Sequence, residues 1–354
     1  MSRFFSRKFD NLTPYTPGEQ PKIKDLVKLN TNESPYPPSK KAVRCAFDAA
    51  RELQLYPDPT CQELTQRMAE IWGVEPDEIL ITNGSDEILN FAFMAYCDEN
   101  TPAVFPDITY GFYKVFAQLL NVPYEEIPLK DDFGININDY MNVGKTIFIA
   151  NPNAPTGILL SLSEIEEIVR GNPNNVVVID EAYIDFGGES AVPLIKKYDN
   201  LLVTQTFSKS RSMAGARLGL GIGSKALIRD LNTIKYSTNP YNINKMTMAS
   251  GLGVLEDEAY TRKNCKSICE TREYTKKMLL MMDFEFTDSA ANFIFAKHKT
   301  LSGEMIYNRL REKGILVRHF DGDRIKEYNR ITVGTKKQMQ SFLRAVSEIL
   351  EENK

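Results

Sequence analysis

A lysine follows an apolar stretch at Lys209, and an arginine stands eight residues later at Arg217. A lysine that is held where it can lose its proton can form an imine with an aldehyde. If that aldehyde also carries a phosphate, hydroxyl groups and a guanidinium are needed to hold it, and Thr206, Ser208 and Arg217 offer these groups. The spacing therefore suggests a covalent cofactor site. A loop rich in serine, lysine and arginine after a strand also fits an ordinary solvated turn.

A second apolar stretch, residues 176–179, ends in the acid Asp180, and Tyr183 follows three residues later. A carboxylate that is partly buried at a strand end needs a cationic partner, and a protonated pyridine nitrogen would serve. The Tyr183 hydroxyl is suited to donate to a phenolate oxygen. As a bare pattern, Asp180 fits equally well a loop acid or the N-cap of a helix, and Tyr183 fits a packing role.

The segment from Asn83 to Asp86 joins a predicted strand to a predicted helix. Free backbone N–H groups at the start of such a helix can bind a phosphate without any basic side chain. A strand, a glycine turn and a helix are also common without a ligand. Residues 151–157 end another predicted strand with two prolines, which indicates a rigid polar loop rather than a flexible spacer.

These segments follow the strands of a predicted α/β domain. Ser161 and Glu164 fit a capping box at the start of one of its helices, and Gly171 follows that helix. Apolar strands separated by helices indicate a largely parallel sheet covered on both faces. Ligands of such sheets bind beyond the carboxyl ends of the strands, where these polar residues collect. Strands are expected at residues 78–82, 103–105, 146–150, 176–180 and 201–207, and helices between them include 85–97 and 163–170.

The pattern changes after about residue 235 to that of a smaller α+β domain. The first thirty residues are rich in proline and glycine, which predicts an extended arm lying on another part of the protein. We therefore expect an arm at 1–30, a large domain at 31–235 and a small domain at 236–354. In the last of these, helices are expected at residues 258–282, 302–313 and 336–351, and strands at 291–297, 316–320 and 330–333.

The composition describes a globular protein without a strong charge bias. Its 354 residues are 42% hydrophobic, and 43 basic against 47 acidic side chains give a net charge of −4, so no general attraction to nucleic acid or membrane is expected. Five scattered cysteines indicate free thiols in a reducing compartment. With two histidines, a metal site around Cys265 and Cys269 or a histidine-based triad is hard to complete, and we expect neither. No stretch approaches the roughly twenty apolar residues of a membrane span, so we expect a cytoplasmic protein.

Seven motifs occur in an order and spacing that resemble those of the fold type I, class I/II pyridoxal-phosphate aminotransferases. Within them the chain is most similar to the histidinol-phosphate aminotransferase family. The resemblance extends from residue 29 to the last predicted strand, and it implies a large domain with a mostly parallel sheet plus a smaller α+β domain. The motifs are residues 56–58, 83–87, 109–111, 151–157, 180–183, 208–217 and 330–334.

The resemblance implies a role for each matching residue around pyridoxal 5'-phosphate. Lys209 would hold the cofactor as an imine and move a proton between the substrate α-carbon and the cofactor. Asp180 would keep the pyridine nitrogen protonated, Tyr183 would hydrogen-bond the ring hydroxyl oxygen, and Tyr110 would stack on the ring. The cofactor phosphate would be held by Gly84, Ser85, Asp86, Thr206, Ser208 and Arg217.

Two further positions bear on the cofactor. Tyr56 matches a tyrosine that reaches the cofactor phosphate of the neighbouring subunit, so the resemblance implies a homodimer with shared active sites. Ala154 departs from the family, because an asparagine that contacts the ring hydroxyl oxygen usually stands there. Asn153 is the nearest amide that could take over this hydrogen bond, whose loss would cost roughly 1.5–3 kcal/mol.

The substrate must supply an amine and an anionic group. Arg330 matches the family arginine that binds the acidic end of the substrate, and Arg318 is a second candidate for a phosphate. Guanidinium groups hold carboxylates and phosphates alike, and either arginine also fits a surface ion pair. Tyr15, Asn32 and Glu33 match family positions near the imidazole end of the substrate.

Three hypotheses follow from this resemblance. The first is an aminotransferase that interconverts histidinol phosphate plus 2-oxoglutarate with imidazole-acetol phosphate plus glutamate, in histidine biosynthesis. The second keeps the fold and changes the reaction, to that of an aromatic amino acid aminotransferase or a threonine-phosphate decarboxylase. The third is a non-enzymatic cofactor-binding sensor domain of a transcription regulator, against which the acidic charge balance counts.

Overall fold

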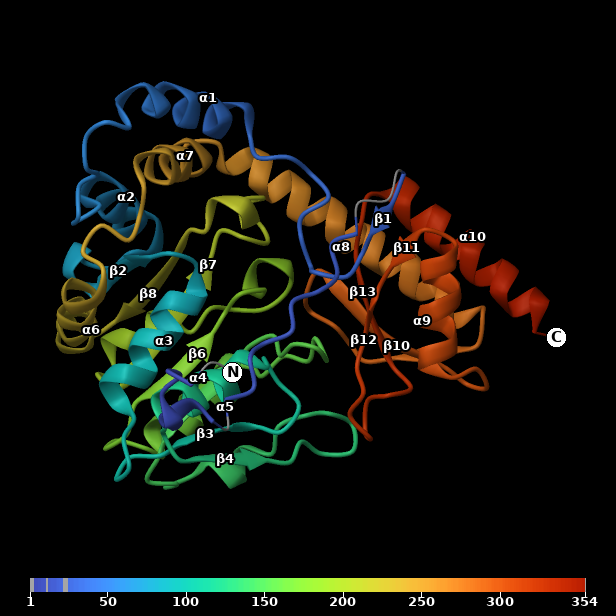
Figure 1. Ribbon diagram of the computed structural model, residues 1–354, viewed down its shortest axis with the longest axis horizontal. Helices are drawn as coiled ribbons and strands as arrows, with labels where there is room; N and C mark the ends of the chain where they lie inside the picture. The colour runs from blue at the N-terminus through green and yellow to red at the C-terminus, as the bar shows by residue number, and fades with distance from the viewer. Residues whose placement is uncertain (1–2, 11, 22–24, 354) are drawn as a thin grey trace.

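The computed structural model describes residues 3–10, 12–21 and 25–353, which form two lobes (Figure 1). The larger lobe is built on a seven-stranded sheet with the order β2-β8-β7-β6-β5-β3-β4 within the described residues. Its neighbouring strands are parallel except β8, which is antiparallel to both β2 and β7. The strands are β2 (Ile79–Thr82), β3 (Ala103–Pro106), β4 (Tyr124–Ile127), β5 (Thr146–Ala150), β6 (Val177–Asp180), β7 (Leu201–Thr206) and β8 (Gly219–Gly223).

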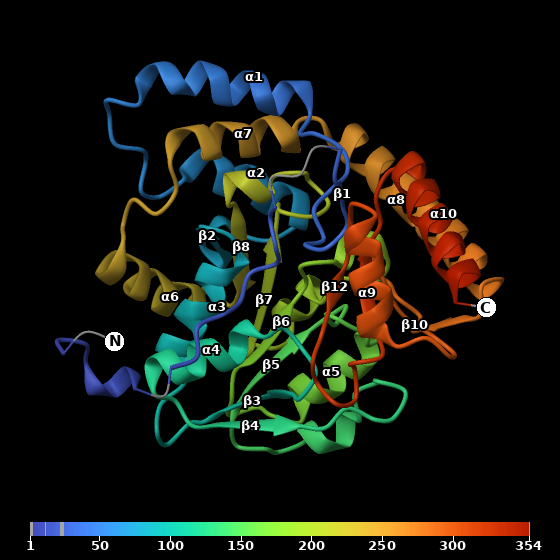
Figure 2. The same ribbon diagram turned by 45° about the vertical axis from the view of Figure 1, so that its right-hand side comes forward.

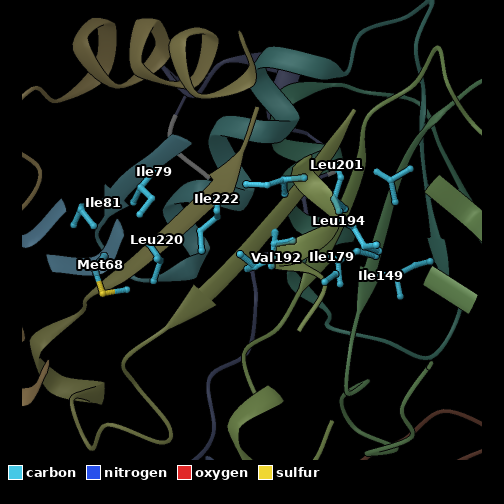
Figure 3. Packing of buried hydrophobic residues seen from close by; sticks show 14 of the residues in the cluster. Met68, Ile79, Ile81, Ile149, Ile179, Val192, Leu194, Leu201, Leu220 and Ile222 are labelled. Atoms are coloured by element: carbon cyan, nitrogen blue, oxygen red, sulfur yellow. The ribbon is translucent and has the colours of Figure 1, made fainter. Parts of the chain in front are cut away.

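Both faces of this sheet are buried, as apolar parallel strands require. Ile147 and Ile149 of β5 belong to one apolar cluster and Phe148 to another, because side chains alternate along a strand. Figure 3 shows the first cluster, in which side chains of β2, β5, β6 and β8 meet. Its helices are α1 (Lys40–Ala49), α2 (Gln62–Trp72), α5 (Leu162–Arg170) and α7 (Lys245–Leu255). Those of the second cluster are α3 (Ser85–Tyr96), α4 (Phe112–Leu120) and α6 (Lys225–Thr238).

The predicted strands of this sheet occur within about two residues of their expected bounds, and the capping box of Ser161 with Glu164 begins α5. Two strands were not predicted. β4 is an edge strand with two exposed glutamates, and β8 contains three glycines, which weaken a strand signal. Gly219 is required there, because a Cβ atom would lie 2.4 Å from the carbonyl carbon of Gly84 at the start of α3.

The smaller lobe contains a four-stranded antiparallel sheet with the order β12-β13-β10-β9 in the described part of the chain. The predicted strand 316–320 is divided between two sheets, since β11 pairs in parallel with β1 of the arm and β12 pairs with β13. The elements are β1 (Val27–Lys28), α8 (Glu258–Leu280), β9 (Phe284–Phe286), β10 (Phe293–His298), α9 (Gly303–Glu312), β11 (Ile315–Leu316), β12 (Arg318–His319), β13 (Asn329–Thr332) and α10 (Lys336–Glu352).

The division between the lobes follows the packing of the helices. Val254 and Leu255 of α7 belong to the core of the large sheet, and α7 lies beside α1 (Lys40–Ala49) at the top of Figure 1. Cys265 and Ile268 of α8 belong to the core of the small lobe. The domain boundary near residue 235 stays a prediction, and this packing favours a boundary near Glu256.

The arm runs from the small lobe across the large one, as its winding blue course in Figure 2 shows. Its Thr13 backbone N–H donates to the Gln118 side chain of α4 at 3.3 Å, and the Tyr15 ring lies 4.5 Å from that of Phe112. The arm therefore brings residues from the start of the chain to the carboxyl edge of the sheet. Among the described residues, no helix combines the length and the apolarity needed to span a membrane.

Candidate active site

A cavity of about 420 Å³ lies at the carboxyl ends of the central strands. Ala150, Asp180 and Thr206 line it and are the last residues of β5, β6 and β7. The fold thus places the cavity where ligands of parallel sheets bind. Most of the predicted cofactor residues meet on its wall: Ser85, Asp86, Tyr110, Asp180, Tyr183, Thr206, Ser208, Lys209 and Arg217.

Lys209 presents its ammonium group to this cavity. Its Nζ donates to the carbonyl oxygen of Thr31 at 3.1 Å and lies 5.9 Å from the centre of the Tyr183 ring. Within the described residues, no carboxylate forms an ion pair with Nζ, so the amine is not occupied by a close anion. The lysine is therefore available for a covalent bond to a carbonyl group.

The loop that carries Lys209 is anchored to the turn that follows Tyr183. Arg211 is buried, and its guanidinium lies 2.9 Å from the Asp185 carboxylate and 5.0 Å from the centre of the Phe207 ring. The Ser210 hydroxyl also donates to Asp185. These contacts fix the two segments of the site relative to each other.

Asp180 is a buried carboxylate with one unused oxygen. Its Oδ2 accepts from the Tyr113 hydroxyl at 3.1 Å, whereas Oδ1 is buried without a hydrogen-bond partner among the described residues. Burial raises the pKa of Asp180 to about 7, and the Tyr113 hydrogen bond opposes the rise. A buried carboxylate oxygen without a donor is costly, so a cationic donor in the cavity would stabilise it. A protonated pyridine nitrogen fits that requirement.

A set of donors suited to phosphate lies at the start of α3. Gly84 has φ +74° and precedes the helix without a side-chain cap, so the first backbone N–H groups of α3 remain available to an anion. The Arg217 guanidinium lies 2.9 Å from Asp86, which accepts from the Tyr110 hydroxyl at 2.6 Å. A Cβ atom at position 84 would lie 2.6 Å from that guanidinium.

Two hydroxyls complete this set. The Thr206 hydroxyl donates to the Ser208 hydroxyl at 2.9 Å, and both side chains are buried at the cavity wall. Hydroxyls, a guanidinium and a helix N-terminus therefore face the same space, and their binding of a phosphate stays a prediction.

The loop after β5 does not provide the predicted amide. Asn153 donates both of its amide hydrogens, to the Ile108 carbonyl at 2.9 Å and to the Thr156 hydroxyl at 3.0 Å, and accepts from Thr109. Ala154 lines the cavity instead. Asn153 thus has no free amide hydrogen to replace the hydrogen bond that the asparagine usual at position 154 would make.

Arg330 is a half-buried side chain, and its guanidinium has no anionic partner among the described residues. One of its terminal amino groups donates to the Asn30 carbonyl at 3.1 Å, its Nε has no hydrogen-bond partner, and the group lies 5.4 Å from the centre of the Phe293 ring. Burial lowers its pKa. Arg318 stands directly opposite Arg330 on β12 and donates to the Thr16 carbonyl at 3.4 Å.

The remaining predicted substrate residues occupy different positions. Glu33 lines the cavity and pairs with Lys28. Asn32 is buried beside the cavity, where it bonds to Tyr183 and Thr332. Tyr15 is 39% exposed and packs on α4. Tyr56 lies away from this cavity, is 81% exposed and stacks on Tyr241 at 4.7 Å between ring centres.

Sequence reasoning missed two contributors to the site. Tyr113 donates to Asp180, but its place on an apolar helix gives it the pattern of a core residue. Thr31 supplies the carbonyl that Lys209 contacts, and a backbone group leaves no signal in residue type. In the described part of the chain there is no cluster of three or more residues suited to bind a metal.

The sequence profile of the family described as aminotransferase class I and II matches residues 24–346. The chain belongs to this family. A curated relative, the histidinol-phosphate aminotransferase of Brachyspira hyodysenteriae, is 50% identical over 356 residues, which cover 99% of this chain and 100% of the relative. Histidinol-phosphate aminotransferase 1 of Hydrogenovibrio crunogenus is 47% identical over 352 residues, 99% of both chains.

A solved structure has the same fold as this aminotransferase. Histidinol-phosphate aminotransferase from Sinorhizobium meliloti, in complex with pyridoxal-5'-phosphate, superposes with a TM-score of 0.86 at 21% identity and covers 92% of this chain and 91% of that chain. The predicted family and fold class are thus confirmed. The roles of single residues stay predictions.

We expect Asp180→Asn to change how the stability of the cofactor-free protein depends on pH. An acid whose pKa rises on folding, here from 3.8 to about 7, binds more protons in the folded state between these values, so wild-type stability falls as pH rises through this window. The variant has no carboxyl group at position 180, so its stability lacks this dependence on pH. Between pH 5 and pH 8 it should gain stability relative to wild type, by an amount on the order of 2 kcal/mol in urea unfolding.

The exposed acid Asp77, replaced by asparagine, serves as a control that should follow the wild-type curve. Glu181 is also buried with its pKa raised to about 7, so part of the decline should remain in Asp180→Asn. An unchanged pH dependence in that variant would show that the Asp180 carboxylate carries no such penalty.

Proposed function

We propose that this chain is a pyridoxal-phosphate-dependent histidinol-phosphate aminotransferase that interconverts histidinol phosphate plus 2-oxoglutarate with imidazole-acetol phosphate plus glutamate. Full-length relatives at 47–50% identity that carry this name support the reaction. The observation in the structure that carries the proposal is the convergence of Lys209, the unpaired Asp180 oxygen and the α3 N-terminus on one cavity. The five cysteines are free thiols, which supports a cytoplasmic location.

The residues of the cavity fit the cofactor. When bound, pyridoxal phosphate would act as an electron sink for removal of a proton from the substrate α-carbon. The Lys209 amine would hold the cofactor and then move that proton, and Asp180 would keep the ring nitrogen protonated. Tyr183 would donate to the ring oxygen, and Tyr110 would cover the ring face. The phosphate would be bound by backbone groups at the start of α3, at Gly84, Ser85 and Asp86, and by the side chains of Thr206, Ser208 and Arg217.

The pairing of Arg318 with Arg330 supports a phosphorylated substrate. Like charges directly opposite on neighbouring antiparallel strands repel each other, and neither guanidinium forms an ion pair within the described residues. A phosphate dianion between them would relieve the repulsion and accept paired hydrogen bonds from each. A single carboxylate would neutralise only one of the two charges.

Lys209→Ala tests the cofactor assignment. Wild-type protein loaded with pyridoxal phosphate should absorb visible light, and borohydride should fix the cofactor to Lys209 in peptide mass spectra. The variant should lose both the fixed cofactor and measurable turnover. Lys225→Ala, a change on the exposed side of α6, should retain both. Cofactor fixed to any other lysine would overturn the assignment.

Arg318→Ala and Arg330→Ala test the substrate. Loss of a hydrogen bond to a charged group costs roughly 1.5–3 kcal/mol, so Arg318→Ala should lower kcat/KM for histidinol phosphate about 10- to 100-fold. It should affect unphosphorylated amines such as phenylalanine less. Arg330→Ala should impair both histidinol phosphate and 2-oxoglutarate, whereas Arg309→Ala, on the exposed face of α9, should impair neither. Equal losses in Arg318→Ala for phosphorylated and unphosphorylated amines would instead favour an aromatic aminotransferase.

We also propose a homodimer in which Tyr56 serves the neighbouring active site. A cluster of exposed apolar and aromatic side chains supports this arrangement, since such surfaces mark protein contacts. Phe47 lies on α1, Leu53, Leu55 and Tyr56 lie in the segment after it, and Tyr241 stacks on Tyr56. The exposed fractions of these side chains are 63% for Phe47, 55% for Leu53, 58% for Leu55, 81% for Tyr56 and 44% for Tyr241.

Mixed dimers test this sharing. Lys209→Ala and Tyr56→Ala should each be inactive or weak alone. In a hybrid of the two, one site receives both defects and the other receives neither, so about half of the wild-type activity per hybrid dimer should return if each site works independently. Hybrids isolated with two different affinity tags make the measurement direct. Absence of recovery in confirmed hybrids would place Tyr56 in its own subunit's site.

A further inference from the structure

Asn32 is buried, and its backbone is held in place by hydrogen bonds. It is 1% exposed and lies in the left-handed region with φ +56°. Its backbone N–H donates to the Thr332 hydroxyl at 2.9 Å, and its carbonyl accepts from Asn292 at 3.0 Å. Both backbone groups are thus held by the small lobe, which leaves the side chain little freedom to turn.

The hydrogen bonds also decide which way the Asn32 amide faces. The Thr332 hydroxyl accepts from the Asn32 backbone, so its own hydrogen is free to donate to Asn32 Oδ1, which lies 3.0 Å away. The amide nitrogen is then the atom that faces Tyr183, and it donates to the Tyr183 hydroxyl oxygen at 3.0 Å. The backbone N–H and the side-chain Oδ1 of Asn32 are therefore both hydrogen-bonded to the hydroxyl of Thr332.

This arrangement fixes the role of the Tyr183 hydroxyl. A phenol has one hydrogen to donate, and here the oxygen already accepts from Asn32. Within the described residues, no acceptor takes the Tyr183 hydrogen, and Tyr183 lines the cavity. Ala154, in the same buried cluster as Tyr183, offers only a methyl group, and the amide of Asn153 is used elsewhere. The Tyr183 hydrogen is thus the free donor on this part of the wall.

We propose that Asn32, oriented by Thr332, is a positioning residue that keeps the Tyr183 hydroxyl as a donor to the oxygen of the cofactor ring. The inference rests on the proposed function, because the ring oxygen is the acceptor it requires. An amide that donates to Tyr183 prevents the hydroxyl from turning toward the protein. Tyr183 would thereby be the side chain that donates to the ring oxygen, because Ala154 offers no donor.

The pH dependence of the visible absorption of the cofactor-loaded protein provides a test that does not need turnover. A hydrogen bond to the ring oxygen withdraws negative charge from it and so weakens its hold on the nearby proton of the lysine linkage. Loss of that hydrogen bond should raise the midpoint pH of the absorption change. We expect roughly 0.5–1 pH unit for Asn32→Ala, and more for Tyr183→Phe, which removes the donor itself.

The double variant separates positioning from a general structural effect. If Asn32 acts through the Tyr183 hydroxyl, Asn32→Ala should change nothing further once Tyr183→Phe is present, whereas independent effects would add. Because alanine is strained at φ +56°, Thr332→Val gives a second route that leaves Asn32 in place. It should raise the midpoint in the same direction, and Thr332→Ser, which keeps the hydroxyl, should restore the wild-type value.

The outcomes distinguish the two proposals. If wild type binds pyridoxal phosphate and shows the absorption change, but Asn32→Ala and Thr332→Val keep its midpoint, the positioning role is wrong and the proposed function stands. Additive shifts in the double variant would likewise overturn the role. If wild type binds no pyridoxal phosphate, the proposed function fails, and the acceptor that Asn32 is proposed to serve fails with it.

Discussion

A carboxylate buried at the end of a central strand is the constraint around which the site is arranged. Asp180 closes β6 between two other buried strands, where water cannot solvate its charge. One oxygen has the Tyr113 hydroxyl and the other has no partner among the described residues. The ionised Asp180 therefore carries an electrostatic cost in the central sheet that a cationic ligand in the adjoining cavity would remove.

The polar residues around Asp180 are held by contacts with one another on the cavity wall and with residues behind it. Arg211 and Asp185 tie the loop of Lys209 to the turn of Tyr183, and Asp86 receives both Arg217 and Tyr110. The loop of Lys209 and the side chains of Arg217 and Tyr110 thus have neighbours that limit their movement. Such preorganisation lets a site bind its ligand without first having to order side chains.

The sequence predicted the large sheet well because its strands are short apolar runs bounded by turns and helices. It failed at β8, where Gly219 and Gly221 lie against the start and the first turns of α3, a contact between segments far apart in the chain. The same limit applies to the site. Lys209, Asp180 and Tyr183 stand at strand ends and carry recognisable chemistry, whereas Thr31 acts through its backbone and Tyr113 resembles a core residue. The role of Asn32 depends on Thr332, three hundred positions away, which no local pattern contains.

The segment from Asn30 to Asn32 has a mechanical consequence. Its three successive residues contact Arg330 through a carbonyl, Lys209 through a carbonyl and Tyr183 through a side chain. The segment is also joined to the small lobe through β1 and β11. Three residues of chain span at most about 11 Å, so the segment acts as a short tether between the two lobes. A rotation of the small lobe about the large one would therefore change two contacts together, the one between Thr31 and the Lys209 amine and the one between Asn32 and the Tyr183 hydroxyl.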